Sequence, residues 1–193
     1  MKYLNNMVDI IKRSIDTIEE DKFDALLEDS VRTLKDGKKI IVSGLGKNVP
    51  ICDKFVGTMN SLGLEASFLN TNSAVHGDLG IVRDGDLLII LTKSGETVES
   101  VYLTEQVMKR DVTLWLLTFE RDSVLARTIP NSLVLELEHE GDMWNIVPNN
   151  STTINLLVLQ ALAMQIAEKM ELTLEDFKRN HPGGHIGVVL QGE

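Results

Sequence analysis

Apolar residues near the start of the chain recur every three or four positions, with charged residues between them. The apolar positions between residues 3 and 36 are Leu4, Met7, Val8, Ile11, Ile15, Ile18, Phe23, Leu26, Leu27, Val31 and Leu34. This spacing is typical of amphipathic helices. We therefore expect two helices that end at Gly37, because glycine commonly follows the last residue of a helix.

Five short runs rich in leucine and β-branched residues follow, and each has the length of a strand. They are residues 39–43, 65–69, 86–92, 112–118 and 132–136. Helical stretches at 48–62, 96–110 and 122–128 separate several of these runs, an alternation that indicates parallel strands. Residues 87–91 are apolar at every position, as expected when helices cover both faces of a sheet. The pattern predicts a three-layer α/β/α sandwich.

Residues 151–170 form a predicted helix that is apolar on nearly every side. Such a helix needs cover on all faces. One side can pack on the sheet, and the other side, with the N-terminal helices, suggests a subunit interface. Because no repeat or linker divides the chain, we expect one domain over residues 1–193. It would comprise N-terminal helices (1–37), an α/β core (38–170) and a C-terminal helix with a His-Pro-Gly-Gly loop (171–193).

The overall charge excludes several classes of partner. The chain of 193 residues has 19 basic and 29 acidic residues and a formal net charge of −10, so we expect no nucleic acid or anionic membrane as partner. The only cysteine is Cys52, which rules out an internal disulfide. Four acidic residues among the first twenty, and polar interruptions in the longest apolar stretch, argue against a signal peptide and a membrane span. We expect a cytoplasmic protein.

Ligands of open parallel sheets bind beyond the carboxyl ends of the strands. The loop after the first predicted strand reads Ser-Gly-Leu-Gly-Lys-Asn over residues 43–48. A phosphate-binding P-loop requires Ser or Thr where Asn48 follows the lysine, and a dinucleotide fingerprint requires a small residue where Val49 stands. Taken alone, the loop is typical of a glycine turn into a helix, with Lys47 as a solvated lysine.

The loop after the third predicted strand combines hydroxyl groups with a glycine. Thr92, Ser94 and Thr97 supply the hydroxyls, and Gly95 would let the backbone approach a ligand closely at a helix that begins near Glu96. The alternative is an ordinary helix start capped by Ser94. We favour a phosphate site, because free amides at a helix start let an acidic protein hold an anion without a basic patch.

Two histidines lie in glycine-rich segments. His76 falls in the turn 74–80 at the expected ligand face, although a lone histidine is more often a bystander. His181 belongs to the Asn-His-Pro-Gly-Gly-His segment 180–185, where Pro-Gly-Gly cannot continue a helix and therefore precludes a helical pair of metal ligands. A frayed tail is the alternative for this segment. His139, within the acidic run 136–142, is interpreted as a surface residue.

Together these motifs resemble the SIS (sugar isomerase) domain family, and within it the D-arabinose 5-phosphate isomerases. The matching segments are GLGK at 44–47, HGDLG at 76–80, SGETVE at 94–99, PNNSTT at 148–153 and HPGG at 181–184. In order and spacing they cover about residues 38–187. The Ser-Gly-Glu segment marks SIS domains in general, whereas HGDLG with a terminal HPGG is more specific.

The resemblance implies a flavodoxin-like sheet of five parallel strands, a homotetramer with sites shared between subunits, and no cofactor or metal. It also implies interconversion of D-ribulose 5-phosphate and D-arabinose 5-phosphate, a step toward the sugar acid Kdo. The implied catalytic residues are Lys47, His76, Glu99 and His181, the last reaching a neighbouring subunit's site. The expected residues for substrate and phosphate binding are Ser43, Gly44, Thr92, Ser94, Gly95 and Thr97.

The chain departs from the family pattern at two places. Asn145 stands where similar enzymes carry a glutamate, three residues before the proline that matches Pro148. Longer members continue into paired CBS modules, whereas this sequence stops at Glu193. The alternatives to the arabinose 5-phosphate reaction are another sugar-phosphate isomerase, such as 6-phospho-3-hexuloisomerase, and a non-catalytic module that binds sugar phosphates.

Overall fold

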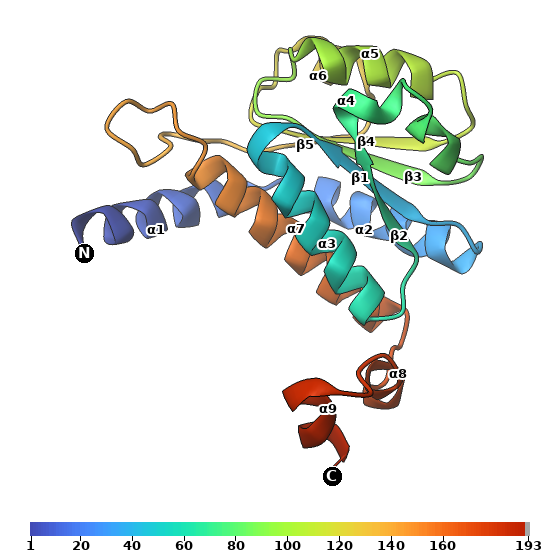
Figure 1. Cartoon of the computed structure of the whole chain (residues 1–193). Helices are drawn as coiled ribbons and strands as arrows, with labels where there is room; N and C mark the ends of the chain where they lie inside the picture. The colour runs from blue at the N-terminus through green and yellow to red at the C-terminus, as the bar shows by residue number, and fades with distance from the viewer. Residues whose placement is uncertain (192–193) are drawn as a thin grey trace.

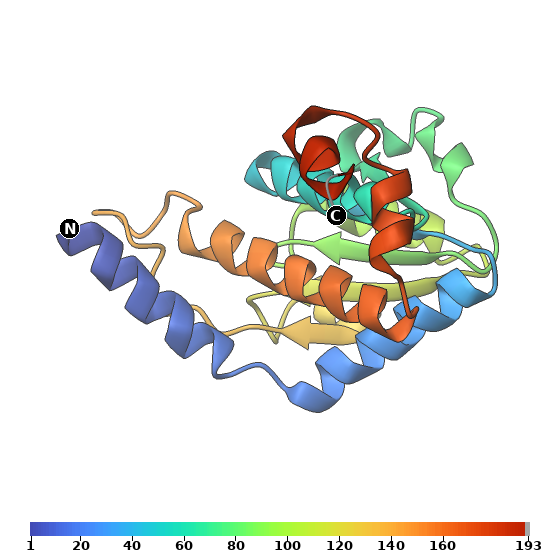
Figure 2. The same ribbon diagram turned by 90° about the horizontal axis from the view of Figure 1, so that it is seen from below.

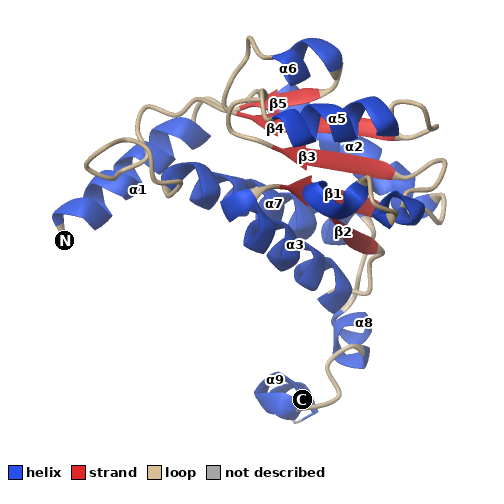
Figure 3. Ribbon diagram, turned by 45° about the horizontal axis from the view of Figure 1, so that its top comes forward, coloured by secondary structure: helices blue, strands red, loops and turns tan. Residues whose placement is uncertain are grey.

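The centre of the molecule is a five-stranded parallel sheet, as the strand-length apolar runs predict. The structure, a computed structural model, describes residues 1–191. The strands are β1 (Ile40–Gly44), β2 (Ala66–Asn70), β3 (Leu87–Leu91), β4 (Thr113–Thr118) and β5 (Ser132–Val134). Their order across the sheet is β2-β1-β3-β4-β5, and all neighbours run parallel (Figure 3).

Helices cover both faces of the sheet and complete the predicted three layers. The helices are α1 (Lys2–Ile15), α2 (Glu20–Lys35), α3 (Val49–Ser61), α4 (Thr71–Ala74), α5 (Val98–Val107), α6 (Val124–Thr128), α7 (Asn150–Lys169), α8 (Leu174–Arg179) and α9 (Gly184–Gln191), with 3-10 turns η1 (Gly46–Asn48) and η2 (Asp78–Ile81). Helices α4, α5 and α6 lie on one face, and α2, α3 and α7 lie on the other (Figure 1).

The alternation of side chains along β3 explains the two cores. Leu87, Ile89 and Leu91 pack in one cluster with α2, α3 and α7, whereas Leu88 and Ile90 pack in the other with α5 and α6. Successive residues of a strand point to opposite faces of the sheet. A strand buried on both faces must therefore be apolar at every position, which is the pattern found at residues 87–91.

Helix α7 is covered by its neighbours on one side only. Ile154 and Leu162 are fully buried, whereas Leu157 and Met164 are exposed. Helix α1 packs against α7 and extends beyond the edge of the sheet (Figure 2). The predicted packing of one side is thus present, and the other side is uncovered in a single chain. Within residues 1–191, no helix is both long enough and apolar enough to cross a bilayer.

Several element boundaries differ from the sequence-based expectation. The helix expected near Glu96 begins at Val98, because the Glu96 amide donates to Ser94 Oγ and closes a turn first. Helix α4 and the two 3-10 turns were not predicted, because three or four residues are too few to show a helical period. The C-terminal segment forms two helices, α8 and α9, with the irregular His-Pro-Gly stretch between them.

The packing of α7 gives a direct test of this core. We expect Leu162→Ala to lower the free energy of unfolding by about 2–5 kcal/mol, because it removes apolar atoms and leaves a cavity. Leu157→Ala, on the exposed side of the same helix, should cost no more than about half of that loss. Urea unfolding at several protein concentrations measures both. Equal losses would show that the two sides of α7 are equally buried.

Candidate functional site

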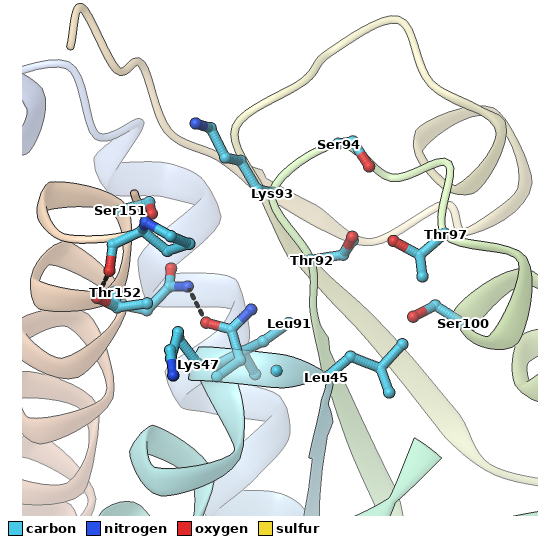
Figure 4. A pocket seen from close by; sticks show the side chains of 14 residues that line it. Leu45, Lys47, Leu91, Thr92, Lys93, Ser94, Thr97, Ser100, Ser151 and Thr152 are labelled. Atoms are coloured by element: carbon cyan, nitrogen blue, oxygen red, sulfur yellow. Dashed lines mark hydrogen bonds between the residues drawn. The ribbon is translucent and has the colours of Figure 1, made fainter. Parts of the chain in front are cut away.

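The order of the strands creates one place where a ligand site is expected. In the order 2-1-3-4-5, the strands that follow β1 along the chain are added first on one side of it (β2) and then on the other (β3). Ligands of such sheets bind at this switch point between β1 and β3. Gly44 at the end of β1 lies level with Leu91 at the end of β3. A cavity of about 240 Å³ opens there, lined by Leu45, Gly46, Lys47, Asn48, Leu91, Thr92, Lys93, Ser94, Thr97, Ser100, Pro148, Ser151, Thr152 and Asn155 (Figure 4). Since pockets for drug-sized ligands span roughly 300–1,000 Å³, this cavity suits a smaller molecule.

Hydroxyl groups line the side of the cavity that belongs to β3 and α5. Thr92, Ser94 and Thr97, all predicted from the sequence, are among the lining residues. Ser100 joins them because it lies one helical turn after Thr97. Figure 4 shows these four side chains on the same side of the cavity. The site thus gathers several neutral hydrogen-bond donors at one point.

The start of α5 adds backbone donors to these hydroxyls. The first hydrogen bond of the helix runs from the Val101 amide to the Thr97 carbonyl, so the amides of Val98, Glu99 and Ser100 precede the helical ladder. Among the described residues, no side-chain carboxylate accepts from these first amides. The start of a helix carries roughly half a positive charge. The hydroxyls and amides together are suited to an oxyanion such as phosphate.

Gly95 shapes this loop by packing against α6. Its φ is +64°, and a Cβ there would lie 2.1 Å from Ser123 Oγ. The Gly95 amide donates to Thr92 Oγ1 at 3.2 Å, and its carbonyl accepts from the Leu125 amide at 3.1 Å. The missing side chain therefore makes room for α6. We expected it to make room for a ligand, and in the structure that side of Gly95 faces away from the cavity lining.

The start of α7, on the opposite wall, is already occupied by a carboxylate of the protein itself. The Glu140 side chain is fully buried. Its carboxylate accepts from the amides of Asn149 (3.1 Å) and Ser151 (3.0 Å), from Ser151 Oγ (2.7 Å) and from Lys93 Nζ (2.6 Å). Glu96 likewise accepts from the first amide of α6, that of Val124, at 2.8 Å. Of these three helix starts, only that of α5 is left for a ligand.

The charge of Glu140 is stabilised in spite of its burial. Burial alone would raise the pKa of Glu140, but the hydrogen bonds from Lys93 and Ser151 outweigh burial and hold this pKa below its ordinary value. The carboxylate is therefore ionised at neutral pH and forms a compensated ion pair with Lys93 at the cavity rim.

Glu140 is buried within the acidic run 136–142, and the neighbouring His139, expected at the surface, is partly buried. Gly141, at φ +89°, turns the chain so that the glutamate points inward, and Asn145 Oδ1 accepts from the Glu140 amide at 2.7 Å. Asn145 itself has φ +57°, a conformation that asparagine tolerates. Although Asn145 departs from the family pattern, the loop does place a carboxylate beside the cavity.

Two lysines line the cavity of this acidic chain, and Glu140 compensates the charge of one of them, Lys93. Lys47, a predicted site residue, is in η1 and lines the cavity with an exposed side chain. Lys93 extends from the end of β3 toward the first turn of α7, where Glu140 holds it (Figure 4). Local charge, rather than the net charge of −10, therefore sets the potential inside the cavity.

Four other predicted residues do not line the cavity. Ser43 is fully buried, and its hydroxyl bonds to Thr71 Oγ1 at 2.8 Å. Gly44 is buried at the end of β1. Glu99, in the first turn of α5, and His76, in the connection after α4, are exposed near the carboxyl edge of the sheet. The structure thus brings together Lys47 and the hydroxyl loop, with Glu99 and His76 outside the lining.

His181 lies at the far end of α3 from the cavity. Its Nε2 bonds to Ser61 Oγ at 2.7 Å, its Nδ1 bonds to the Phe177 carbonyl at 2.8 Å, and its ring stacks on the Phe177 ring at 4.0 Å. Helix α3 follows directly after Asn48, which lines the cavity, and ends at Ser61, a rise of roughly 20 Å at 1.5 Å per residue. His181 therefore cannot reach the cavity of its own chain.

Sequence reasoning missed several residues of the site. Lys93 and Ser100 flank the recognised loop, and their role depends on side-chain direction, which the motif does not give. Glu140 was missed because nothing in the sequence distinguishes it from the other acidic residues of the run 136–142. Asn155 had a visible signal, since it is a polar residue in an otherwise apolar helix, and in the structure it is 1% exposed and lines the cavity.

Known proteins share both the sequence pattern and the fold. A family model described as the SIS domain matches residues 33–165. The arabinose 5-phosphate isomerase KdsD of Pseudomonas aeruginosa is 33% identical over 90% of this chain and 56% of its own length. KdsD of Francisella tularensis is 29% identical over 97% of this chain and 59% of its own length. The chain thus spans little more than half the length of these curated relatives.

A solved structure matches over almost the full length of both chains. It is an E. coli CFT073 protein in complex with arabinose 5-phosphate, 29% identical, with a TM-score of 0.86 over 93% of this chain and 94% of that chain. The match confirms the five-stranded parallel sheet flanked by helices.

The Glu140 network predicts a pH-dependent contribution to stability. Glu140→Gln should lower the free energy of unfolding at pH 7 by about 1.5–3 kcal/mol, the range for hydrogen bonds to charged groups. The native pKa is depressed, so this contribution is fully present above the unfolded value of about 4.3 and is lost as pH falls through the native pKa.

Urea unfolding of both proteins between pH 7 and pH 3 measures this difference. The gap between wild type and Glu140→Gln should be constant down to about pH 4.3 and shrink below it. A gap that does not change with pH would mean that the charge of Glu140 is not what stabilises the start of α7.

Proposed function

The chain belongs to the SIS domain family, and we propose that it is a sugar-phosphate isomerase that interconverts D-ribulose 5-phosphate and D-arabinose 5-phosphate. The names of its relatives support this reaction, as does the complex of the E. coli structure with arabinose 5-phosphate. We further propose that residues 1–193 act as one SIS unit.

The observation that carries the proposal is the open start of α5 at the switch point. Hydroxyls of Thr92, Ser94 and Thr97 surround it, and the neighbouring helix starts are filled by Glu96 and Glu140. A phosphate group accepts several hydrogen bonds at once and is stabilised at a helix start. The phosphate of the sugar would therefore bind at α5, with the carbons of the sugar extending into the cavity.

The reaction requires one base that moves a proton between two carbons. In the direction from aldose to ketose, the base removes the proton of C2, the electron pair forms the C1–C2 double bond, and the aldehyde oxygen gains a proton to give an enediol. The proton is then returned to C1 while the hydroxyl on C2 loses its proton and becomes the ketone. Glu99, in the first turn of α5, is our candidate for this base.

Two further groups would stabilise the charge that develops on oxygen. Lys47 lines the cavity, and His76 lies on a neighbouring loop at the same edge of the sheet. A donor aimed at a developing oxyanion is often worth about 3 kcal/mol. We assign both residues to the oxygens on C1 and C2.

His181 would open the furanose ring of the aldose, since an imidazole can give and take protons near neutral pH. Because it lies roughly 20 Å from the cavity of its own chain, this role requires a neighbouring subunit. A homotetramer with shared sites is therefore part of the proposal. We also propose that the protein is cytoplasmic and that its product, arabinose 5-phosphate, is used in the synthesis of Kdo.

Product analysis tests the proposed reaction. Purified protein incubated with D-ribulose 5-phosphate should form D-arabinose 5-phosphate, identified by NMR. Turnover of a hexulose 6-phosphate instead would favour a sister isomerase. Binding without any turnover would favour a sugar-phosphate-binding module.

Removal of the proposed base gives a second test. Glu99→Gln should fold normally but lower kcat by about 100-fold or more, because an amide cannot accept the proton. Exchange of the C2 proton of arabinose 5-phosphate in D₂O, followed by NMR, measures the step directly. Glu105→Gln, an exposed acid of the same helix, is the control and should exchange normally. Retained exchange in Glu99→Gln would assign the base to another residue.

A further inference from the structure

A hydrogen-bonded pair of asparagines, Asn155 buried and Asn48 partly buried, connects two walls of the cavity. Asn155, in the second turn of α7, donates from Nδ2 to Asn48 Oδ1 at 3.0 Å, and Asn48 immediately precedes α3. Both side chains are among those that line the cavity. Asn155 follows Ser151 by four residues, so the two share the face of α7 that meets the cavity.

Keeping an amide at position 155 carries an energetic cost. Asn155 is 1% exposed, and its Oδ1 is buried without a hydrogen-bond partner among the described residues. A buried acceptor left in this state costs about 1–3 kcal/mol. An apolar residue would suit the surrounding helix and would avoid this cost. Buried polar groups almost always have a hydrogen-bond partner, so the amide at position 155 calls for an explanation.

The bond from Asn155 determines how the Asn48 amide is oriented. An asparagine side chain has an acceptor end and a donor end. Because Asn48 Oδ1 accepts from Asn155, the NH₂ group of Asn48 is directed away from α7. In the described part of the chain, no hydrogen bond engages this NH₂ group, and the Asn48 residue is only partly buried.

Gly44 provides the space for Asn48. A Cβ at position 44 would lie 2.8 Å from Asn48 Cβ and 3.5 Å from Leu91 Cβ. Any larger residue at the end of β1 would therefore push Asn48 out of its position beside the cavity. This contact gives the predicted Gly44 a role in the site although it does not line the cavity.

We propose that Asn48 Nδ2 donates a hydrogen bond to an oxygen of the bound sugar phosphate and that Asn155 is the positioning residue that fixes this donor. The inference rests on the proposed function, since it requires a sugar phosphate in the cavity. The oxygen belongs either to the phosphate or to the sugar. A purely structural pair, which only ties α3 to α7, is the competing explanation.

Two substitutions keep a hydrogen bond between positions 48 and 155 and remove the NH₂ donor of residue 48 from the cavity. In Asn48→Asp, the carboxylate still accepts from Asn155 but has no NH₂ group. In Asn155→Asp, the new carboxylate accepts from Asn48 Nδ2. The direction of the hydrogen bond is then reversed, and Asn48 Oδ1 faces the cavity. Asn155→Leu introduces no charge and releases the Asn48 amide to rotate. Asn60→Asp, at the exposed far end of α3, is the control for the change in net charge, and the neutral Asn155→Leu is the control for repulsion by a charge inside the cavity.

Calorimetric binding of arabinose 5-phosphate and of inorganic phosphate gives the decisive measurement, with urea unfolding of each variant in parallel. We expect Kd for arabinose 5-phosphate to rise about 10-fold or more in Asn48→Asp and Asn155→Asp, and a few-fold in Asn155→Leu. Asn60→Asp should bind like the wild type. An equal rise for inorganic phosphate would assign the contact to the phosphate group, and a rise for the sugar phosphate alone would assign it to the sugar.

The binding measurement separates this inference from the proposed reaction. A wild-type protein that binds arabinose 5-phosphate without converting it would overturn the reaction and leave the inference standing. Kd values within twofold of the wild type in folded Asn48→Asp and Asn155→Leu would overturn the inference, even with full isomerase activity. A wild type that binds neither ligand would overturn both.

Discussion

The burial of Glu140 at the start of α7 determines which part of the cavity can receive an anion. Its carboxylate satisfies two backbone amides, a hydroxyl and Lys93, so the positive end of the longest helix is neutralised from within. Without this internal anion, the starts of α5 and α7 would compete for the same ligand across a small cavity. In the proposed function, the network would therefore orient the substrate, with its phosphate at α5 and its carbons toward α7.

For the proposed phosphate ligand, this arrangement explains how a protein with a net charge of −10 would bind an anion. Attraction over long distance is screened within roughly 10 Å at physiological salt, so the potential inside a cavity depends on nearby dipoles and charges. Here these are the first amides of α5, the hydroxyl side chains beside them and Lys47, whereas the charge of Lys93 is compensated by Glu140. The net negative charge works against binding of large polyanions.

Much of the fold followed from the sequence because burial leaves a periodic signal. The all-apolar run at 87–91 predicted a strand covered on both faces, and the spacing of apolar residues predicted the long helices. Thr92, Ser94, Thr97 and Lys47 were found because the carboxyl ends of parallel strands meet at one edge. Glu140 and Lys93 were not, because their contact joins two loops that lie far apart in the chain. The turn at Gly141 that directs Glu140 inward produces no periodic pattern in the sequence.

The contact between Gly95 and α6 has a consequence for how strongly the loop can bind. Ser123 fills the space behind the glycine, and the Leu125 amide holds its carbonyl, so the loop has its final shape before any anion arrives. Conformational entropy is lost while the protein folds rather than when the ligand docks, and preorganisation of this kind strengthens binding without adding a contact. Residues of α6 that lie outside the cavity would thereby contribute to the affinity for the proposed sugar phosphate.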